Sequence, residues 1–348
     1  SRSRRSSDLT TNATAKDIEL TSDGSIVIVG DIEDSQGNSD IILMTLSFDG
    51  TRFFENSRTV FGLDTLGQNT DETATSVTQT NDGFIVSGST SKIVVKAESG
   101  GPNDTRDALH VRYFDDLTIY PSSWRIGHGP GNFDVGIKTI QVAPDRFYFF
   151  SYSNKIKPPN SVDFNYYLLG LGSDGETNSP DNFLPGTAAS DERLSSVIIS
   201  PPQSGEGFLL AGVSTSTGGG SDVFVVKLRK DLNFGTTDVQ FEKVLNTPLG
   251  ATTSEKVSAF PLSTSGFLIL TNEKTGTAQN FSLNRITNDG FSVWASPVIF
   301  GGEKDDRIGT VLELPDGSIG IIGTFGVGED GETKMTFIKV NREGKFLK

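Results

Sequence analysis

Short apolar runs separated by polar turns dominate the sequence. The runs are four to seven residues long, rich in Val, Ile and Phe, and bounded by Gly and Asp. Runs of this length and composition predict β-strands rather than helical turns. One predicted strand, here called strand B, recurs at 25–30, 84–88, 147–151, 208–212, 267–271 and 318–323. An apolar strand C follows each copy, and no long helical periodicity is present.

A heptapeptide precedes each copy of strand B and predicts a further strand, called strand A. An outer strand D carries a large aromatic residue in most copies, namely Phe54, Trp124, Phe183, Phe241 and Trp294. Six four-stranded antiparallel units in one chain predict an all-β fold, a six-bladed β-propeller over residues 12–348. Its blades start near residues 12, 71, 134, 191, 254 and 305. An open solenoid is the alternative architecture, but no polar capping repeat is present at either end.

The turns of the predicted blades are of two kinds. The A-to-B and C-to-D turns are short and contain glycine, usually after Asp, at Gly24, Gly50, Gly83, Gly175, Gly207, Gly266, Gly290, Gly317 and Gly344. Glycine at these positions suits the positive φ of tight hairpins. The predicted B-to-C loops are longer and more varied, at 31–39, 89–106, 154–162, 213–221, 272–279 and 324–332. Alternating strand direction places these loops at the opposite end of each blade, which predicts a recognition face there.

Two parts of the repeat pattern are incomplete. The last copy ends at GKFLK, so either these residues form a short stub or segment 1–11 completes the blade. The third copy, VAPDRFYFFSYS, lacks both the Asp-Gly-Gly turn and the closing glycine, which predicts a distorted blade. Segment 1–11 contains Arg2, Arg4 and Arg5 and is interpreted as a solvated tether, a basic arm or a closing strand.

Composition and charge exclude several classes of function. Acidic residues exceed basic ones by 44 to 30, and the net charge of −14 disfavours nucleic acid as a partner. The absence of cysteine excludes disulfides, thiolate metal sites and cysteine nucleophiles. No apolar run is long enough to predict a membrane-spanning helix.

The segment WASPVIFGGEKDDRIGTVLELPDGSIGIIGT at 294–324 resembles a propeller repeat found in exported proteins of Bacteroidetes-type bacteria. The segments at 73–90 and 221–233 resemble the same repeat. The resemblance extends from about residue 12 to the end of the chain. It implies export to the periplasm, outer membrane or cell surface, often with a lipid anchor, here upstream of Ser1. It implies no particular chemistry.

The first position of the heptapeptide is the main candidate site, occupied by Asn12, Asp71, Asp134, Asp191, Ser254 and Asp305. If strand A is innermost, these side chains surround the mouth of a central channel. They could bind a cation or a polar ligand, or accept hydrogen bonds from backbone N–H groups of the crossing turns. Their repetition favours the structural role, because a residue present in every blade usually serves the blade.

The loop 89–106 is the second candidate, because it is the longest and carries Lys92, Lys96 and Arg106 on an otherwise acidic protein. No cofactor is predicted. Calcium is the alternative, but no D-x-D-x-D-G loop is present to support it. His110 and His128 have no partner at a useful spacing, which favours packing or surface roles. Trp124 and Trp294 could stack on sugars, but their place on the outer strand favours packing between blades.

Three functions follow as hypotheses. The first is an exported, non-enzymatic protein that binds a glycan or a protein partner through the long-loop face. The second is an extracellular hydrolase of polysaccharides or phosphate esters that uses carboxyl groups near the channel mouth. The third is a spacer or assembly subunit of an envelope complex.

Overall fold

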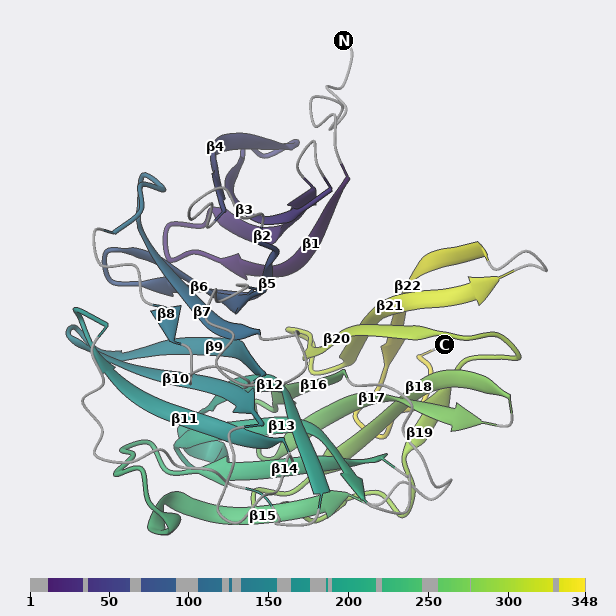
Figure 1. Ribbon diagram of the computed structural model, residues 1–348. Coiled ribbons are helices and arrows are strands. Elements are labelled where there is room, and N and C mark those ends of the chain that lie inside the picture. Colours follow the sequence, from purple (N-terminus) through teal and green to yellow (C-terminus); the bar gives the residue numbers. More distant parts are fainter. Residues whose placement is uncertain are drawn as a thin grey trace, which may run out of the picture. The chain divides into compact units, whose positions relative to one another are not determined.

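The computed structural model describes residues 12–33, 37–62, 70–91, 106–120, 125–126, 133–154, 164–175, 186, 190–216, 221–245, 256–275, 277–327 and 332–347. The chain divides into two compact units: unit 1 comprises 1–162 with 167–182, and unit 2 comprises 163–166 with 183–348. The described strands form six antiparallel sheets, here called blades 1 to 6 in chain order (Figure 1). The predicted all-β class is therefore confirmed.

Blades 1 to 3 belong to unit 1, and sequential strands are neighbours in each (Figure 1). Blade 1 contains β1 (Ala13–Leu20), β2 (Ile26–Glu33), β3 (Ser39–Phe48) and β4 (Phe53–Phe61). Blade 2 contains β5 (Glu72–Thr80), β6 (Gly83–Thr90), β7 (Asp107–Phe114) and β8 (Arg125–Ile126). Blade 3 contains β9 (Asp134–Ala143), β10 (Arg146–Ser153) and β11 (Asn165–Gly172).

Blades 4 to 6 belong to unit 2 and have the same sequential order. Blade 4 contains β12 (Ser190–Ser200), β13 (Gly207–Ser216), β14 (Ser221–Leu228) and β15 (Val239–Leu245), with short 3₁₀ turns at Pro202–Ser204 and Thr236–Asp238. Blade 5 contains β16 (Val257–Pro261), β17 (Phe267–Thr275), β18 (Ala278–Ile286) and β19 (Val298–Phe300). Blade 6 contains β20 (Arg307–Glu313), β21 (Ile319–Val327) and β22 (Glu332–Val340).

The predicted fourth strand is present in blades 1, 2, 4 and 5, whereas blades 3 and 6 have three strands in the described part of the chain. After β22 the chain turns, and Phe346 forms an isolated bridge with Val340. Similar bridges follow strand C in blades 2 and 5, so this contact belongs to the turn after β22. The two alternatives for the end of the last blade, a stub or closure by segment 1–11, stay predictions. Segment 1–11 lies outside the described residues, so its role as a tether or closing strand stays a prediction.

The apolar faces of neighbouring blades pack against each other within each unit. One cluster joins blades 1 and 2 through Val29, Leu43, Val86 and Val111. Similar clusters join blades 4 and 5 and blades 5 and 6. Burying one such side chain contributes about 1.5–3 kcal/mol, so this packing is the main source of stability. Trp294 packs against the cluster of blades 5 and 6, whereas Trp124 lies outside the described residues.

A β-bulge in strand A explains the glycine that closes strand B. Strand A is bulged at Ala15/Asp17, Ala74/Ser76, Gly136/Lys138, Leu194/Ser196 and Ile308/Thr310. The strand B residue opposite the bulge is glycine in four blades, at Gly30, Gly88, Gly212 and Gly323. A Cβ at these glycines would lie 2.0–2.5 Å from a carbonyl oxygen of strand A. The bulge therefore requires a residue without a side chain.

Blade 3 retains this bulge without the closing glycine. Ser151 takes the strand B position, and the glycine is Gly136 on strand A, directly opposite. A second register shift, between Arg146 and Phe147, lies beside the A-to-B turn. The predicted distortion is thus limited to this hairpin, and β9, β10 and β11 still form a three-stranded sheet.

The two kinds of turn are only partly as predicted. All nine predicted turn glycines have positive φ, between 74° and 151°. The B-to-C loops are shorter than predicted in unit 2, because β13 extends to Ser216, β17 to Thr275 and β21 to Val327. Most of the residues that continue the hairpin ladders are polar, such as Ser214, Asn272 and Thr324, so the sequence shows only a weak apolar signal there. Residues 272–279 in particular form a hairpin rather than a long loop.

Candidate functional site

The acidic residues at the first heptapeptide position bind main-chain N–H groups of the preceding blade. Oδ1 of Asp71 accepts a hydrogen bond from Ser39 N at 3.0 Å. Asp191 accepts one from Phe164 N at 3.1 Å, and Asp305 accepts one from Gln279 N at 2.9 Å. The three donors are the residues at or just before the start of strand C of the preceding blade. The Asn12 amide instead donates to Glu33 within blade 1. These contacts link neighbouring blades. Each of the three carboxylates uses its Oδ1 atom in such a contact.

Asp134 occupies a different position from the other predicted acids. Counted from the bulge, it aligns with Glu72, Glu192 and Asp306, and Phe133 aligns with Asp71. All four residues of this second position are buried, whereas Asp71 and Asp305 are exposed. The heptapeptide alignment had matched Asp134 with Asp71, whereas the strand pairing matches Phe133 with Asp71.

The remaining predicted residues do not assemble with these acids. Arg106 accepts a hydrogen bond at its main-chain oxygen from Asp134 N, and its guanidinium lies 5.8 Å from the centre of the Phe133 ring. Lys92, Lys96 and Ser254 lie outside the described residues. Asp71, Asp191 and Asp305 lie on three different blades. The role of all these residues in ligand binding stays a prediction.

A row of polar side chains along the A strands was missed by the sequence analysis. In unit 1, Asp17 accepts a hydrogen bond from Val77 N at 3.1 Å, and Glu19 accepts one from Gln79 N at 3.3 Å. In unit 2, Ser195 and Ser258 make equivalent contacts with the next A strand, to Val257 and Val311. These side chains satisfy the unpaired edges of the A strands. The Ser and Thr residues late in the heptapeptide could have predicted this row from the sequence.

Glu19 is the titratable group of this row with a shifted pKa. Burial raises its pKa, the positive charge of Lys138 and the hydrogen bond from Gln79 N oppose this, and the negative charge of Asp17 raises it further. Asp17 and Glu19 are two residues apart on the same face of β1, so their Cα atoms are about 7 Å apart. This pair is the nearest approach to an acid–base arrangement that we find in the described residues.

His110 has a packing role, as its place in strand C suggested. The imidazole is fully buried, its Nδ1 lies 2.5 Å from Thr139 Oγ1 and 3.2 Å from Ser87 Oγ, and its ring meets Phe149 edge-on. Burial lowers the pKa of His110 to about 3. His128 lies outside the described residues.

This buried imidazole predicts a dependence of stability on pH. Between the ordinary pKa of 6.5 and the folded value of about 3, the unfolded chain binds a proton at His110 that the folded chain does not. His110 thus contributes a fall in stability of about 1.4 kcal/mol per pH unit as the pH drops through this window. Urea unfolding of the wild type and of His110→Gln over this range should give a shallower pH slope for the variant. Equal slopes would contradict a neutral buried imidazole.

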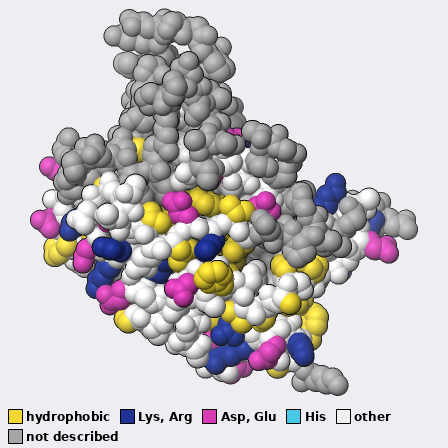
Figure 2. Space-filling model, turned by 90° about the horizontal axis from the view of Figure 1, so that it is seen from below, with side chains coloured by type: hydrophobic (Ala, Val, Ile, Leu, Met, Phe, Trp, Pro, Cys, Tyr) yellow, Lys and Arg dark blue, Asp and Glu magenta, His cyan; other side chains and the backbone are white. Residues whose placement is uncertain are grey.

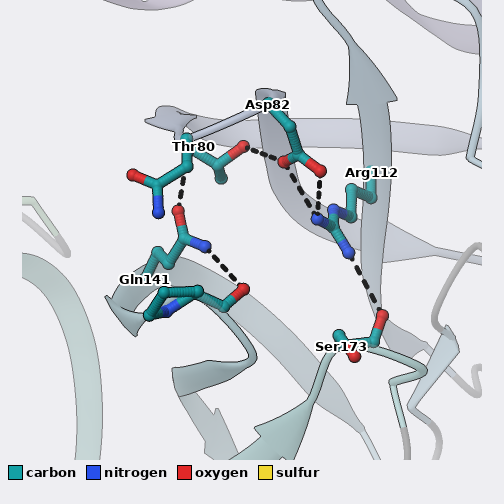
Figure 3. A network of polar contacts seen from close by, with 7 residues as sticks. Thr80, Asp82, Arg112, Gln141 and Ser173 are labelled. Carbon is teal, nitrogen blue, oxygen red and sulfur yellow. Dashed lines mark hydrogen bonds and ion pairs between the residues drawn. The ribbon is translucent and has the colours of Figure 1, made fainter.

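A buried arginine organises the turn end of blades 2 and 3 (Figure 3). Nη2 of Arg112 lies 2.9 Å and 2.7 Å from the two carboxylate oxygens of Asp82, and Nη1 donates to Ser173 O at 3.1 Å. The guanidinium also lies 4.0 Å from the centre of the Tyr120 ring. Asp82 belongs to an Asp-Gly turn, so this turn residue also neutralises a basic residue of strand C. Lys339 and Asp316 form the corresponding pair in blade 6 at 2.6 Å.

Unit 2 contains a groove of about 560 Å³ at the end where the A-to-B turns lie. The turns of blades 4, 5 and 6 form it, with Arg342 from the last C-to-D turn. Its apolar lining comprises Pro201, Phe260, Pro261, Leu314 and Pro315. Glu313, Asp316 and Arg342 supply the charges, and Arg342 Nη2 lies 2.9 Å from Glu313 Oε1. This groove is at the end opposite to the predicted recognition face.

Both acids of the groove have a lowered pKa. Partial burial raises the pKa of Glu313, but hydrogen bonds from Ser263 and Arg342 outweigh this and hold the pKa below its usual range. The hydrogen bonds from Lys339 and Ser318 hold the pKa of Asp316 well below its usual range. The groove thus carries two ionised carboxylates, Glu313 paired with Arg342 and Asp316 paired with Lys339. On the molecular face in Figure 2, acidic and basic side chains are likewise interspersed among apolar ones.

Two features are absent from the described residues. No group of three or more His, Asp or Glu side chains there is arranged as a metal site. None of the helices in that part of the chain has the length and apolar character needed to cross a membrane.

No known protein family and no curated protein matches this sequence. Among solved structures, an α-L-arabinanase of Penicillium chrysogenum bound to arabinobiose is similar, with a TM-score of 0.56, 9% identity, and coverage of 96% of this chain and 94% of that chain. A glucose dehydrogenase is similar with a TM-score of 0.48, 11% identity, and coverage of 95% and 99%. The NanB sialidase of Streptococcus pneumoniae gives a TM-score of 0.39, 12% identity, and coverage of 97% and 57%.

The arabinanase match and the six antiparallel sheets define the class of this protein. It is an all-β protein with the fold of a six-bladed β-propeller. At 9% identity the match shows the fold alone, and a fold by itself implies no particular activity. The resemblance to exported bacterial repeats stays a prediction, because no sequence family is identified.

Proposed function

We propose that this protein is an exported, non-enzymatic β-propeller that binds a protein partner, and that the groove of unit 2 is its recognition site. The observation that carries the proposal is the groove itself. It has a volume of about 560 Å³, a largely apolar lining, and walls formed by three hairpin turns. Turns held by a packed scaffold are suited to recognition. Apolar walls with a few fixed charges are typical of binding sites.

Charge complementarity supports one class of occupant, a peptide segment with an apolar side chain next to a basic one. Two carboxylates, Glu313 and Asp316, line the groove, and they pair with Arg342 and Lys339 respectively. The preference for a basic residue therefore rests on the net charge of the protein. The net charge of −14 adds a long-range attraction for cationic partners. Export and a location in the cell envelope rest on the sequence resemblance alone. Recognition through loop 89–106 remains a second hypothesis, because residues 92–105 lie outside the described part.

A peptide array with defined apolar and basic residues tests this proposal. We expect the wild type to select peptides with Lys or Arg beside a large apolar residue. Leu314→Asp, which puts a charge on an apolar wall, should weaken binding of those peptides at least about tenfold, a loss of about 1.4 kcal/mol. The matched control is Phe291→Asp, because Phe291 is 60% exposed in unit 2 and does not line the groove. Equal losses in both variants, or no peptide selection, would overturn the proposal.

A hydrolase is the second candidate, and the Asp17–Glu19 pair is the observation that favours it. A carboxyl group with a raised pKa next to an ionised one is the arrangement used for glycoside hydrolysis, and inverting enzymes place the two about 6.5–9.5 Å apart. Both groups already accept main-chain hydrogen bonds from β5, which favours the structural role. Polysaccharide or phosphate-ester hydrolysis that is abolished by Glu19→Gln would replace the binding proposal.

A further inference from the structure

Among the buried oxygen atoms of unit 2 that have no hydrogen-bond donor in the described residues, three come from neighbouring segments of blades 5 and 6. They are Oε1 of Glu273 on β17, Oδ1 of Asn280 on β18 and Oδ2 of Asp306 just before β20. The residues are 1%, 3% and 2% exposed. The second oxygen of each carboxylate is engaged, since Glu273 Oε2 accepts Ser282 Oγ at 2.7 Å and Asp306 Oδ1 accepts Gly326 N at 3.0 Å. The three unpaired oxygens are therefore all acceptors in a place that water reaches poorly.

Two of the three side chains, Asn280 and Asp306, meet beside Gly301, and Glu273 lies next to Asn280 in the sheet. A Cβ at Gly301 would lie 1.9 Å from Asn280 Oδ1 and 2.3 Å from Asp306 Oδ2, so both oxygens face the space that the missing side chain leaves. Glu273 and Asn280 are direct partners in the ladder between β17 and β18. Their side chains are on the same face of the sheet, with Cβ atoms about 5 Å apart. Side chains with unpaired oxygens from three segments are thus neighbours in blades 5 and 6.

The charge of this site requires a compensating group. Within the described residues, neither Glu273 nor Asp306 forms an ion pair with Lys or Arg. Burying an uncompensated carboxylate is strongly unfavourable. Rotating the Asn280 amide would give Asp306 Oδ2 a donor, but it would leave Glu273 Oε1 unpaired and would add no positive charge.

We propose that Glu273, Asn280 and Asp306 bind a calcium ion between blades 5 and 6. Carboxylate and carboxamide oxygens are the ligands that this hard cation prefers, and two carboxylates balance its charge. Its six to eight ligands and flexible geometry allow water and main-chain carbonyls to complete the shell, whereas Mg²⁺ demands a nearly ideal octahedron. The site contains two carboxylates and one carboxamide, rather than three acidic or histidine ligands. It is independent of the groove proposed above.

The test is a calcium titration of the full chain after treatment with EDTA. We expect isothermal titration calorimetry with CaCl₂ to show one site per chain, and CaCl₂ to raise the melting temperature by at least about 3 °C. MgCl₂ at the same concentration should give a smaller shift. A wild type that shows no binding and no change in melting temperature would overturn the proposal.

Two variants and a matched control assign the site. Glu273→Gln and Asp306→Asn keep size and hydrogen-bonding capacity but remove a charge, and each should weaken calcium binding at least about tenfold. The control is Asp305→Asn, because Asp305 is the exposed neighbour whose Oδ1 accepts Gln279 N. Calcium binding that survives in both site variants but not in the control would place the ion elsewhere and refute the assignment. An Asp306→Asn protein that is more stable than the wild type without calcium dependence would show that a proton, not a cation, neutralises Asp306.

Discussion

Replacing Asp82 with alanine is expected to destabilise the folded protein by about 3 kcal/mol or more, because it leaves a buried guanidinium without its counter-charge. Arg112 is only 3% exposed and has a bidentate contact with the Asp82 carboxylate. Its contacts with Ser173 O and with the Tyr120 and Phe147 rings supply no negative charge. Chemical denaturation of the wild type and the variant measures the difference.

The matched control for Asp82 is Asp316→Ala in blade 6. Asp316 makes the same contact from an Asp-Gly turn to strand C, but its partner Lys339 is on the surface. Exposed ion pairs contribute little, so this variant should be nearly as stable as the wild type. Comparable losses at both positions would show that the turn geometry, rather than the buried charge, is important.

The effect of Asp82→Ala also has a defined pH dependence. Partial burial raises the pKa of Asp82, but the hydrogen bond and charge of Arg112 outweigh this and lower the pKa below its ordinary value of 3.8. The stabilisation is therefore present above that value and is lost as the pH falls through the folded pKa. The difference between wild type and variant should shrink at strongly acidic pH.

The second large effect is expected for Gly88→Ala, which should cost at least about 4 kcal/mol or prevent folding. A Cβ at Gly88 would lie 2.0 Å from Thr73 O, a main-chain atom of the paired strand β5. The clash can be relieved only by separating β5 from β6, which would also disturb the buried cluster of blades 1 and 2. Thermal unfolding and the far-UV circular dichroism of the variant are the measurements.

Gly235→Ala is the control for this substitution. Gly235 has an extended backbone with φ of −135°, and no heavy atom lies within 4 Å of the position of its Cβ. Alanine there should change the stability only slightly, and should even favour folding by restricting the unfolded chain. A similar loss at both glycines would contradict the role assigned to the bulge.

The fold could be predicted largely because each blade repeats the same local code. Apolar runs such as 208–212 predict strand B, and the turn glycines predict hairpins, since both signals depend on neighbouring residues only. The lengths of strands B and C could not be predicted as well. In residues 272–279, polar side chains continue a hairpin whose pairing is specified by the partner strand rather than by hydrophobicity.

The candidate sites were harder to predict, because their residues are assembled from separate blades. The heptapeptide alignment identified Asp71, Asp191 and Asp305 as equivalent, but it also included Asp134, although the strand pairing puts Phe133 at that position. The groove of unit 2 combines Phe260, Leu314 and Arg342, which belong to three different turns. No local pattern contains all three.

The sequence by itself determined that this protein is an all-β repeat protein with six sheets and glycine-dependent turns, because strand period, turn chemistry and repetition are local properties of the chain. Only the tertiary structure decided which acidic residues are buried, which ones cap main-chain N–H groups, and where Arg112, Glu273 and Asp306 find or lack a partner. The physical reason is that burial and pairing of a charge depend on the neighbouring blade, which is some 60 residues away in the repeat.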